Sequence, residues 1–126
     1  MSLIEDKLVM EADDNNFEEI LSNTNLPILV DFWSPTCAPC RMQSPIIEQV
    51  AHHYEDKVIF VKVDISKARQ VAQSMKIRSI PTIVIFKNMN VADVRIGLAN
   101  QSVLIRMLDR ALGKTLWQRW FGKKKK

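Results

Sequence analysis

Three short apolar runs constrain the fold more than any other feature of the sequence. They are PILVDFW at residues 27–33, KVIFVKVDI at 57–65 and PTIVIFK at 81–87. Runs of this length, nearly continuous in apolar character and rich in β-branched residues, are typical of strands that are covered on both faces. A chain that covers such strands needs helices on both sides of a sheet, so we expect an α/β protein.

The segments around these runs predict the helices and the remaining strands. Helical patterns span residues 13–23, 40–56, 66–77 and 100–112, and weaker strand patterns span 7–11 and 91–97. The resulting order implies parallel strands joined by crossover helices, followed by an antiparallel hairpin that turns at Asn88-Met89-Asn90. We therefore expect a mixed sheet of about five strands, flanked by helices on both faces.

Local signals suggest how the predicted helices start, end and pack. The second helix would place Met42, Ile46, Ile47 and Val50 on one apolar face and contain Pro45 as a kink. The third helix would begin near Ser66. Asn100 or Ser102 would cap the last helix, and Gly113 would stop it.

Length and charge divide the chain into a body and a basic end. With 126 residues it fits one domain, and all 14 Asp and Glu fall in residues 1–112, together with 12 of the 18 Lys and Arg. Residues 113–126 carry six cations and no acid. We expect a domain over 1–112 and a basic extension over 113–126. The first residues lack a signal-peptide pattern and no segment is apolar enough to span a bilayer, so the expected location is cytoplasmic.

The two cysteines, Cys37 and Cys40, follow the first apolar run at the start of a predicted helix. A Cys-X-X-Cys pair beside a β-α-β pattern is typical of dithiol redox sites. The free N–H groups and the dipole at a helix N-terminus favour a thiolate at Cys37. Cys40 lies one turn later and can reach back to resolve a mixed disulfide. Pro39 suits the first turn, where its missing N–H costs nothing.

Two other interpretations of the cysteines remain, and both are less favoured. A closed zinc site needs four ligands, but His52 and His53 are neighbours that diverge by about 100° around a helix. The thiols could also be inert buried residues. We expect dithiol chemistry with no metal and no cofactor, and the acid Asp31 within an apolar run already points to function because burying it is costly.

Taken together, these residues resemble the thioredoxin family. LVDFWSPTCAPCRMQSPIIEQVA is similar to its strand, active site and kinked helix, and VKVDI to its next strand. IRSIPTIVIFKN resembles its cis-proline segment, and IGL the turn before its last helix. The resemblance covers about residues 5–112. It implies the thioredoxin fold and a protein-disulfide oxidoreductase that acts as a net reductant.

The resemblance also implies roles for four residues in the chemistry. Cys37 would be the nucleophile, and Cys40 the resolving thiol. Asp31 would be the buried carboxylate that takes a proton from Cys40, and Lys62 the lysine near it. The alternative roles are a hydrogen-bonded core acid for Asp31 and an ordinary strand lysine for Lys62.

Other positions match the family's substrate-binding surface. Pro81 would be its cis-proline, leaving the Ile80 backbone free to pair with substrate. Trp33 would pack against the active-site loop, and Gly97 would line the substrate groove. Their alternative roles are a strand-opening proline, a core aromatic and a turn glycine.

The site also departs from the family between and beside the cysteines, where Pro39 follows the usual pattern. Ala38 stands where the family usually has Gly, and Thr36 where it usually has Trp. We expect Ala38 to affect the reduction potential and Thr36 the choice of partner. A hairpin glycine is also replaced around Met89.

The family does not account for the basic extension. Its apolar residues would form a compact face if helical: Leu116, Trp117, Trp120 and Phe121. Together with Arg119 they are the candidate contacts of the extension. Such a segment suits an anionic membrane surface or an acidic protein partner, and less well a nucleic acid. It could equally be solvated or pack on the body.

We therefore expect a monomeric reductant of protein disulfides that receives electrons from an upstream thioredoxin reductase. It would be cytoplasmic, with peripheral membrane contact as a further option. The alternatives are an interaction module recruited by the extension, and a more oxidising disulfide oxidase or isomerase.

Overall fold

The computed structural model describes residues 8–113, and the predicted basic extension lies outside them apart from Gly113. The described strands and helices, in chain order, are β1 Val9–Ala12, α1 Phe17–Ser22, β2 Ile28–Trp33, α2 Ala38–His53, β3 Ile59–Asp64, α3 Arg69–Ser74, β4 Thr82–Lys87, β5 Asn90–Ile96 and α4 Gln101–Ala111. This order confirms the one expected from the apolar runs.

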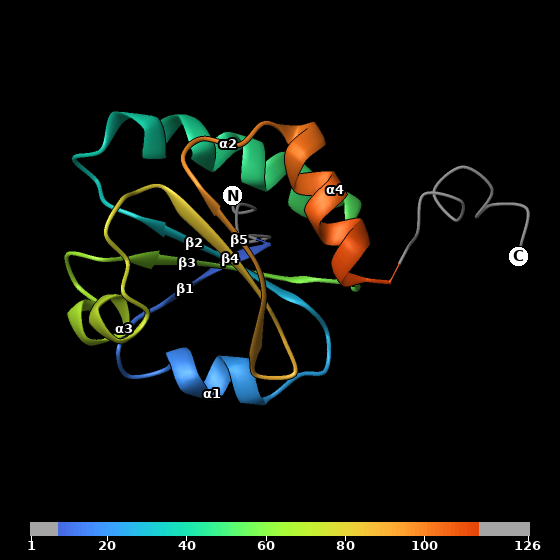
Figure 1. Cartoon of the computed structure of the whole chain (residues 1–126), viewed down its shortest axis with the longest axis horizontal. Coiled ribbons are helices and arrows are strands. Elements are labelled where there is room, and N and C mark those ends of the chain that lie inside the picture. Colours follow the sequence, from blue (N-terminus) through green and yellow to red (C-terminus); the bar gives the residue numbers. More distant parts are fainter. Residues whose placement is uncertain (1–7, 114–126) are drawn as a thin grey trace, which may run out of the picture.

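The strands form one five-stranded sheet in the order β1-β3-β2-β4-β5 (Figure 1). Strands β1 and β2 both run parallel to β3. Strand β4 runs antiparallel to β2, and β5 antiparallel to β4. The mixed α/β sheet expected from the sequence is therefore confirmed, with β2 and the active-site loop that follows it near the centre.

Helices cover both faces of this sheet. Figure 1 shows α2 and α4 on one face and α1 and α3 on the other. On strand β2, Leu29 packs in the core beneath α2 and α4, while Val30 and Phe32 pack with α1 and α3. Because side chains alternate along a strand, Asp31 points to the α2/α4 face. The covering on both faces explains why β2 is apolar at almost every position.

The buried face of α2 differs from the expected one at Met42. Ile47 and Val50 are buried, but the Met42 side chain is 59% exposed, so the predicted apolar face and the buried face of α2 do not fully coincide. Gln43 is fully buried instead. Residues 43, 47 and 50 follow helical spacing, and the polar Gln43 takes a core position because it has backbone partners there. Pro45 lies inside α2.

Helix α3 begins at Arg69 and not near Ser66, so the predicted start is wrong. The Asp64 side chain accepts hydrogen bonds from the N–H and the hydroxyl of Ser66, which forms a turn before the helix. The Asp14 carboxylate then caps α3 by accepting from the backbone N–H groups of Gln70 and Val71. The cap comes from 57 residues earlier in the chain than Val71, so local sequence does not reveal it.

The hairpin between β4 and β5 turns at Asn88 and Met89. Both residues have positive φ, 53° and 70°, as a two-residue turn of this kind requires. Asn90 already pairs with Lys87 in the sheet. The turn is thus one residue shorter than expected, and the methionine occupies a position that favours glycine.

Candidate active site

Cys37 and Cys40 form a disulfide at the N-terminus of α2, with Cα atoms 5.2 Å apart. Cys37 is the N-cap residue, and its Sγ accepts a hydrogen bond from the Cys40 N–H at 3.2 Å. The Cys37 side chain is half-buried, whereas Cys40 is only 1% exposed. Solvent and substrates therefore reach the Cys37 sulfur first.

The loop between β2 and α2 holds Cys37 in place through backbone contacts. The Cys37 N–H donates to the Ser34 carbonyl at 3.2 Å, and the Ser34 and Thr36 hydroxyls lie 3.1 Å apart. Arg41 donates from Nη1 to the Pro35 carbonyl at 3.1 Å, which ties the first turn of the helix to the loop. Thr36, Ala38 and Pro39 are exposed around the disulfide.

Asp31 is buried on the α2/α4 face, the face that also carries α2 and its Cys40. Its side chain is 2% exposed, and its Oδ1 has no hydrogen-bond partner among the described residues. Burial raises the pKa of Asp31 from 3.8 to about 7, although the positive charge of Lys62 opposes the rise. An acid with this pKa exchanges protons near neutral pH.

Lys62 is the neighbour of Asp31 on β3, directly opposite it in the parallel register. Its Nζ lies 4.4 Å from the centre of the Trp33 ring, so the ammonium packs over the indole face. Trp33, Pro35 and Lys62 line a cavity of about 400 Å³. The indole Nε1 is buried without a hydrogen-bond partner in the described chain. Lys62 therefore both lines this cavity and lies beside Asp31 in the sheet.

The segment before β4 faces the disulfide from the other side. The Ile80–Pro81 peptide bond is cis, as expected. The Ile80 carbonyl oxygen lies 3.9 Å from the Cys37 Sγ. Gly97 donates from its N–H to the Pro81 carbonyl at 2.8 Å, with φ of 98°. The structure therefore brings Ile80, Pro81 and Gly97 to the same edge of the site as Cys37.

Gln43 is a residue beside the site that the sequence analysis missed. Its Nε2 donates to the Ala99 carbonyl at 2.9 Å, and its Oε1 accepts from the Ala99 N–H at 2.8 Å. These two bonds attach the helix that carries Cys40 to the loop after Gly97. The available signal was the helical spacing of residues 43, 47 and 50, which places a polar residue on the buried face.

Residues 8–113 contain no group of three or more His, Cys, Asp or Glu side chains that could hold a metal ion. His52 and His53, the alternative ligands considered from the sequence, are both exposed at the end of α2. Within the same range, none of the helices has the length and apolar character needed to cross a membrane.

Comparisons with known proteins agree with this geometry. The family model described as Thioredoxin matches residues 8–110. Thioredoxin 1 of Nostoc sp. is 38% identical over 102 residues, which is 81% of this chain and 95% of that protein. The thioredoxin of Rickettsia bellii is 41% identical over 102 residues, covering 81% of this chain and 97% of that protein. The chain therefore belongs to the thioredoxin family and is a thiol-disulfide oxidoreductase that acts on protein disulfides.

Proposed function

We propose that the protein is a net reductant of protein disulfides, with Cys37 as the nucleophile and Cys40 as the resolving thiol. The observation that carries this assignment is the contrast between the two sulfurs. Cys37 is half-buried at a helix N-terminus, while Cys40 is buried on the same face as Asp31. A substrate disulfide can approach the first sulfur and not the second.

The reduced protein reacts in two exchange steps. The Cys37 thiolate attacks a substrate disulfide, which forms a mixed disulfide and releases one substrate thiolate. The Cys40 thiolate then attacks the Cys37 sulfur, which closes the Cys37–Cys40 disulfide and releases the second substrate thiolate. Two electrons pass to the substrate. An upstream dithiol reductase of the thioredoxin reductase class then reduces the Cys37–Cys40 disulfide with two further electrons.

Asp31 is the base for the second step. Its carboxylate accepts the Cys40 proton, which suits a group whose pKa is about 7. Lys62 opposes the rise in the pKa of Asp31 and so keeps the carboxylate available for proton transfer at neutral pH. Trp33 supports this pair as the ring under the Lys62 ammonium.

The substrate binds across the surface around Cys37. The exposed side chains of Thr36, Ala38 and Pro39 form one side, and Ile80, Pro81 and Gly97 form the other. The half-buried Ile80, whose carbonyl oxygen lies 3.9 Å from the Cys37 Sγ, is the position where an extended substrate segment pairs. The protein acts as a monomer in this scheme, because each proposed role comes from one chain.

The experiment uses the two single cysteine variants and insulin as a protein disulfide substrate. Cys37→Ser abolishes turnover, whereas Cys40→Ser accumulates a mixed disulfide that mass spectrometry detects. If Cys37→Ser kept wild-type turnover, the assignment would be wrong. The reduction potential of the couple tests the direction: a value near that of protein disulfide isomerase, about −180 mV, would favour an oxidase or isomerase over a reductant.

A second role is recruitment to an anionic membrane surface by residues 114–126. The sequence supports it, since Leu116, Trp117, Trp120 and Phe121 stand among six cations. This chain then works in the cytoplasm, where thiols stay reduced, and at its membrane surface. Deleting 114–126 abolishes co-sedimentation with vesicles containing phosphatidylserine and leaves insulin reduction unchanged. Equal binding of the full-length protein and the truncated protein to such vesicles would rule this role out.

A further inference from the structure

An apolar stripe on the edge strand β5 is left uncovered. Val91, Val94 and Ile96 are 52%, 49% and 66% exposed. They pair with Phe86, Val84 and Thr82 of β4, respectively. Since Val84 and Phe86 pack on the α1/α3 face, their partners on β5 point to that face too. Among the residues that the structure describes, these three side chains are therefore open to solvent on the α1/α3 face.

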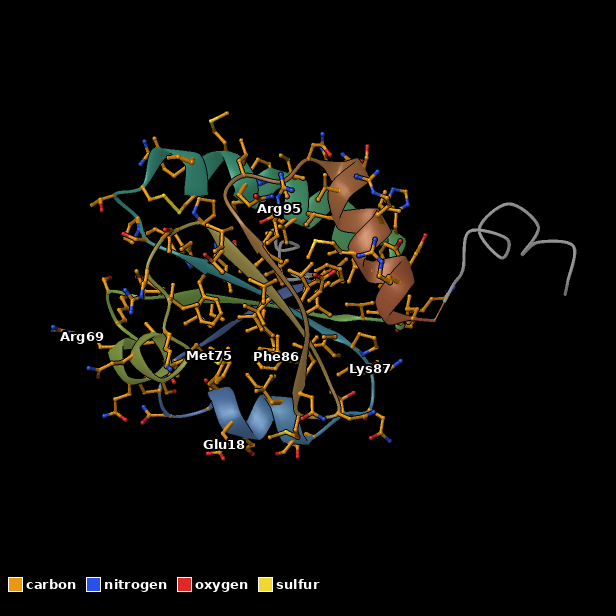
Figure 2. The ribbon with its side chains drawn as sticks, in the orientation of Figure 1. Glu18, Arg69, Met75, Phe86, Lys87 and Arg95 are labelled. Carbon is orange, nitrogen blue, oxygen red and sulfur yellow. A yellow bond between two sulfur atoms is a disulfide. The ribbon has the colours of Figure 1, made fainter. Side chains whose placement is uncertain are left out.

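The stripe forms one wall of a groove. The other wall is the half-buried pair Met75 and Ile77, where the chain leaves α3, and the groove encloses about 250 Å³. Figure 2 shows Met75 beside α3 on this side of the sheet. Lys76 and Arg78 alternate with the apolar wall residues, are exposed, and form no ion pair within residues 8–113. The groove is therefore apolar with a positive rim.

Both walls lead to the disulfide. On one side, Ser79 lines the groove, and the next residue is Ile80, whose carbonyl oxygen lies 3.9 Å from the Cys37 Sγ. On the other side, Ile96 is followed by Gly97, which donates to the Pro81 carbonyl. A polypeptide whose cysteine has reacted with Cys37 can continue from that sulfur directly into the groove.

We propose that the groove binds the segment of a protein substrate next to its disulfide, and that it favours extended segments in which apolar and acidic residues alternate. The apolar side chains contact Val94 and Ile96, and the acids face Lys76 and Arg78. Val91 to Ile96 spans roughly 16 Å, which matches about five extended residues. The inference rests on the proposed function, because it takes Cys37 as the sulfur that attacks the substrate disulfide.

Charge argues against two other occupants of the groove, which are residues 114–126 of this chain and a second copy of the protein. Residues 114–126 contain six cations and no acid, so they would be repelled by Lys76 and Arg78. In a symmetric dimer through this groove, the same two cations of both copies would face each other. A substrate segment with acids has the complementary charge.

The test compares two peptides, each with a single cysteine that forms a mixed disulfide with a chromogenic aryl thiol. The aryl thiol is released when Cys37 attacks the peptide cysteine. One has alternating valine and glutamate around the cysteine, and the other has valine and lysine. In the wild-type protein the glutamate peptide has the lower KM. Arg78→Glu lowers that preference by about threefold at low salt, while kcat for both peptides is unchanged. The preference also falls as salt rises, since the rim is exposed.

Arg69→Glu is the matched control, because Arg69 lies on α3 outside the groove and points away from the body in Figure 2. It leaves the preference between the peptides unchanged. The double variant Val94→Thr/Ile96→Thr keeps β-branched residues on β5 and raises the KM for both peptides about threefold or more, because apolar contact is lost. Thermal unfolding of each variant shows that the fold is intact.

Hydroxyethyl disulfide, which has no polypeptide flanks, separates this proposal from the proposed function. Groove variants turn it over at the wild-type rate, whereas Cys37→Ser does not. Equal effects of Arg78→Glu and Arg69→Glu on the two peptides would overturn the groove proposal and leave the cysteine chemistry intact. A dimer that Val94→Thr/Ile96→Thr dissociates, or a fall in peptide KM after removal of 114–126, would also overturn it, in favour of a second copy or of the chain's own end.

Discussion

The two faces of the sheet bury different kinds of residue. Under α2 and α4, the core contains the polar side chains Asp31, Gln43 and Asp109 among its apolar residues. Over α1 and α3, the core centres on three aromatic rings, with Phe17 6.4 Å from Phe32 and 6.0 Å from Phe86 between centroids. Asp31 and its neighbour Phe32 point to opposite faces of the same strand.

This difference separates the stability of the molecule from its chemistry. The aromatic face is stabilised by apolar burial, which does not depend on pH. The α2/α4 face contains a carboxyl that burial destabilises in its charged form, and in the proposed function the resulting pKa suits this carboxyl to proton transfer near neutral pH. Substitutions on the two faces should therefore change the free energy of unfolding with different signs and with a different dependence on pH.

Phe32→Ala is the largest expected effect. The side chain is fully buried and contacts Phe17, so its removal leaves a cavity and lowers the free energy of unfolding by about 3–5 kcal/mol. Denaturant unfolding at pH 5 and pH 8 should give the same loss. Phe32→Leu, which keeps most of the volume, should lose less than about 1.5 kcal/mol. A loss that changed with pH would contradict the separation of the two faces.

Asp31→Asn should stabilise the disulfide-bonded protein, and only at higher pH. The pKa of Asp31 rises from 3.8 to about 7 on folding, so the folded state holds the proton more tightly and wild-type stability falls as pH rises between these values. Three pKa units correspond to about 4 kcal/mol, absent below pH 4 and complete above pH 7. Urea unfolding of both proteins from pH 4 to pH 8 measures the difference, and parallel curves would refute it.

Gln43→Leu tests the polar contacts of the α2/α4 face. Loss of the amide leaves the buried N–H and carbonyl of Ala99 without their partner, which should cost about 2 kcal/mol. Hydrogen exchange at the Ala99 amide should accelerate by the corresponding factor, roughly 30-fold. The matched control is Met42→Leu at the preceding, exposed position, which should change neither the free energy of unfolding nor the exchange at Ala99. Unchanged exchange at Ala99 in Gln43→Leu would show that the contact is dispensable.

Met89→Gly belongs to neither face and should have the smallest effect. Met89 has φ of 70° in the hairpin turn, a conformation that glycine adopts without steric cost. We expect a gain of about 0.5–1 kcal/mol in the free energy of unfolding, the same at every pH. Met89→Ala retains a Cβ and should give no gain, so equal stability of the two variants would mean that the turn is unstrained.

The sequence predicted the features that depend on local periodicity. The apolar runs gave β2, β3 and β4, and the position of Cys37 after a strand gave the disulfide at a helix N-terminus. Two of the differences involve partners that are distant in the chain. Gln43 is buried because Ala99 lies opposite, and the cap of α3 comes from Asp14, 57 residues before Val71. Periodicity within one segment contains no information about such partners.

The hydrogen bond from the Lys87 ammonium to the Ala111 carbonyl fixes where the chain leaves the body. Lys87 lies at the Ile28 end of the sheet, while β2 delivers Cys37 from its Trp33 end. The exit point of α4 and the disulfide are therefore separated by the length of a strand, roughly 20 Å. An attachment made at Gly113 itself would therefore hold the body on the side away from Cys37 and leave the disulfide accessible.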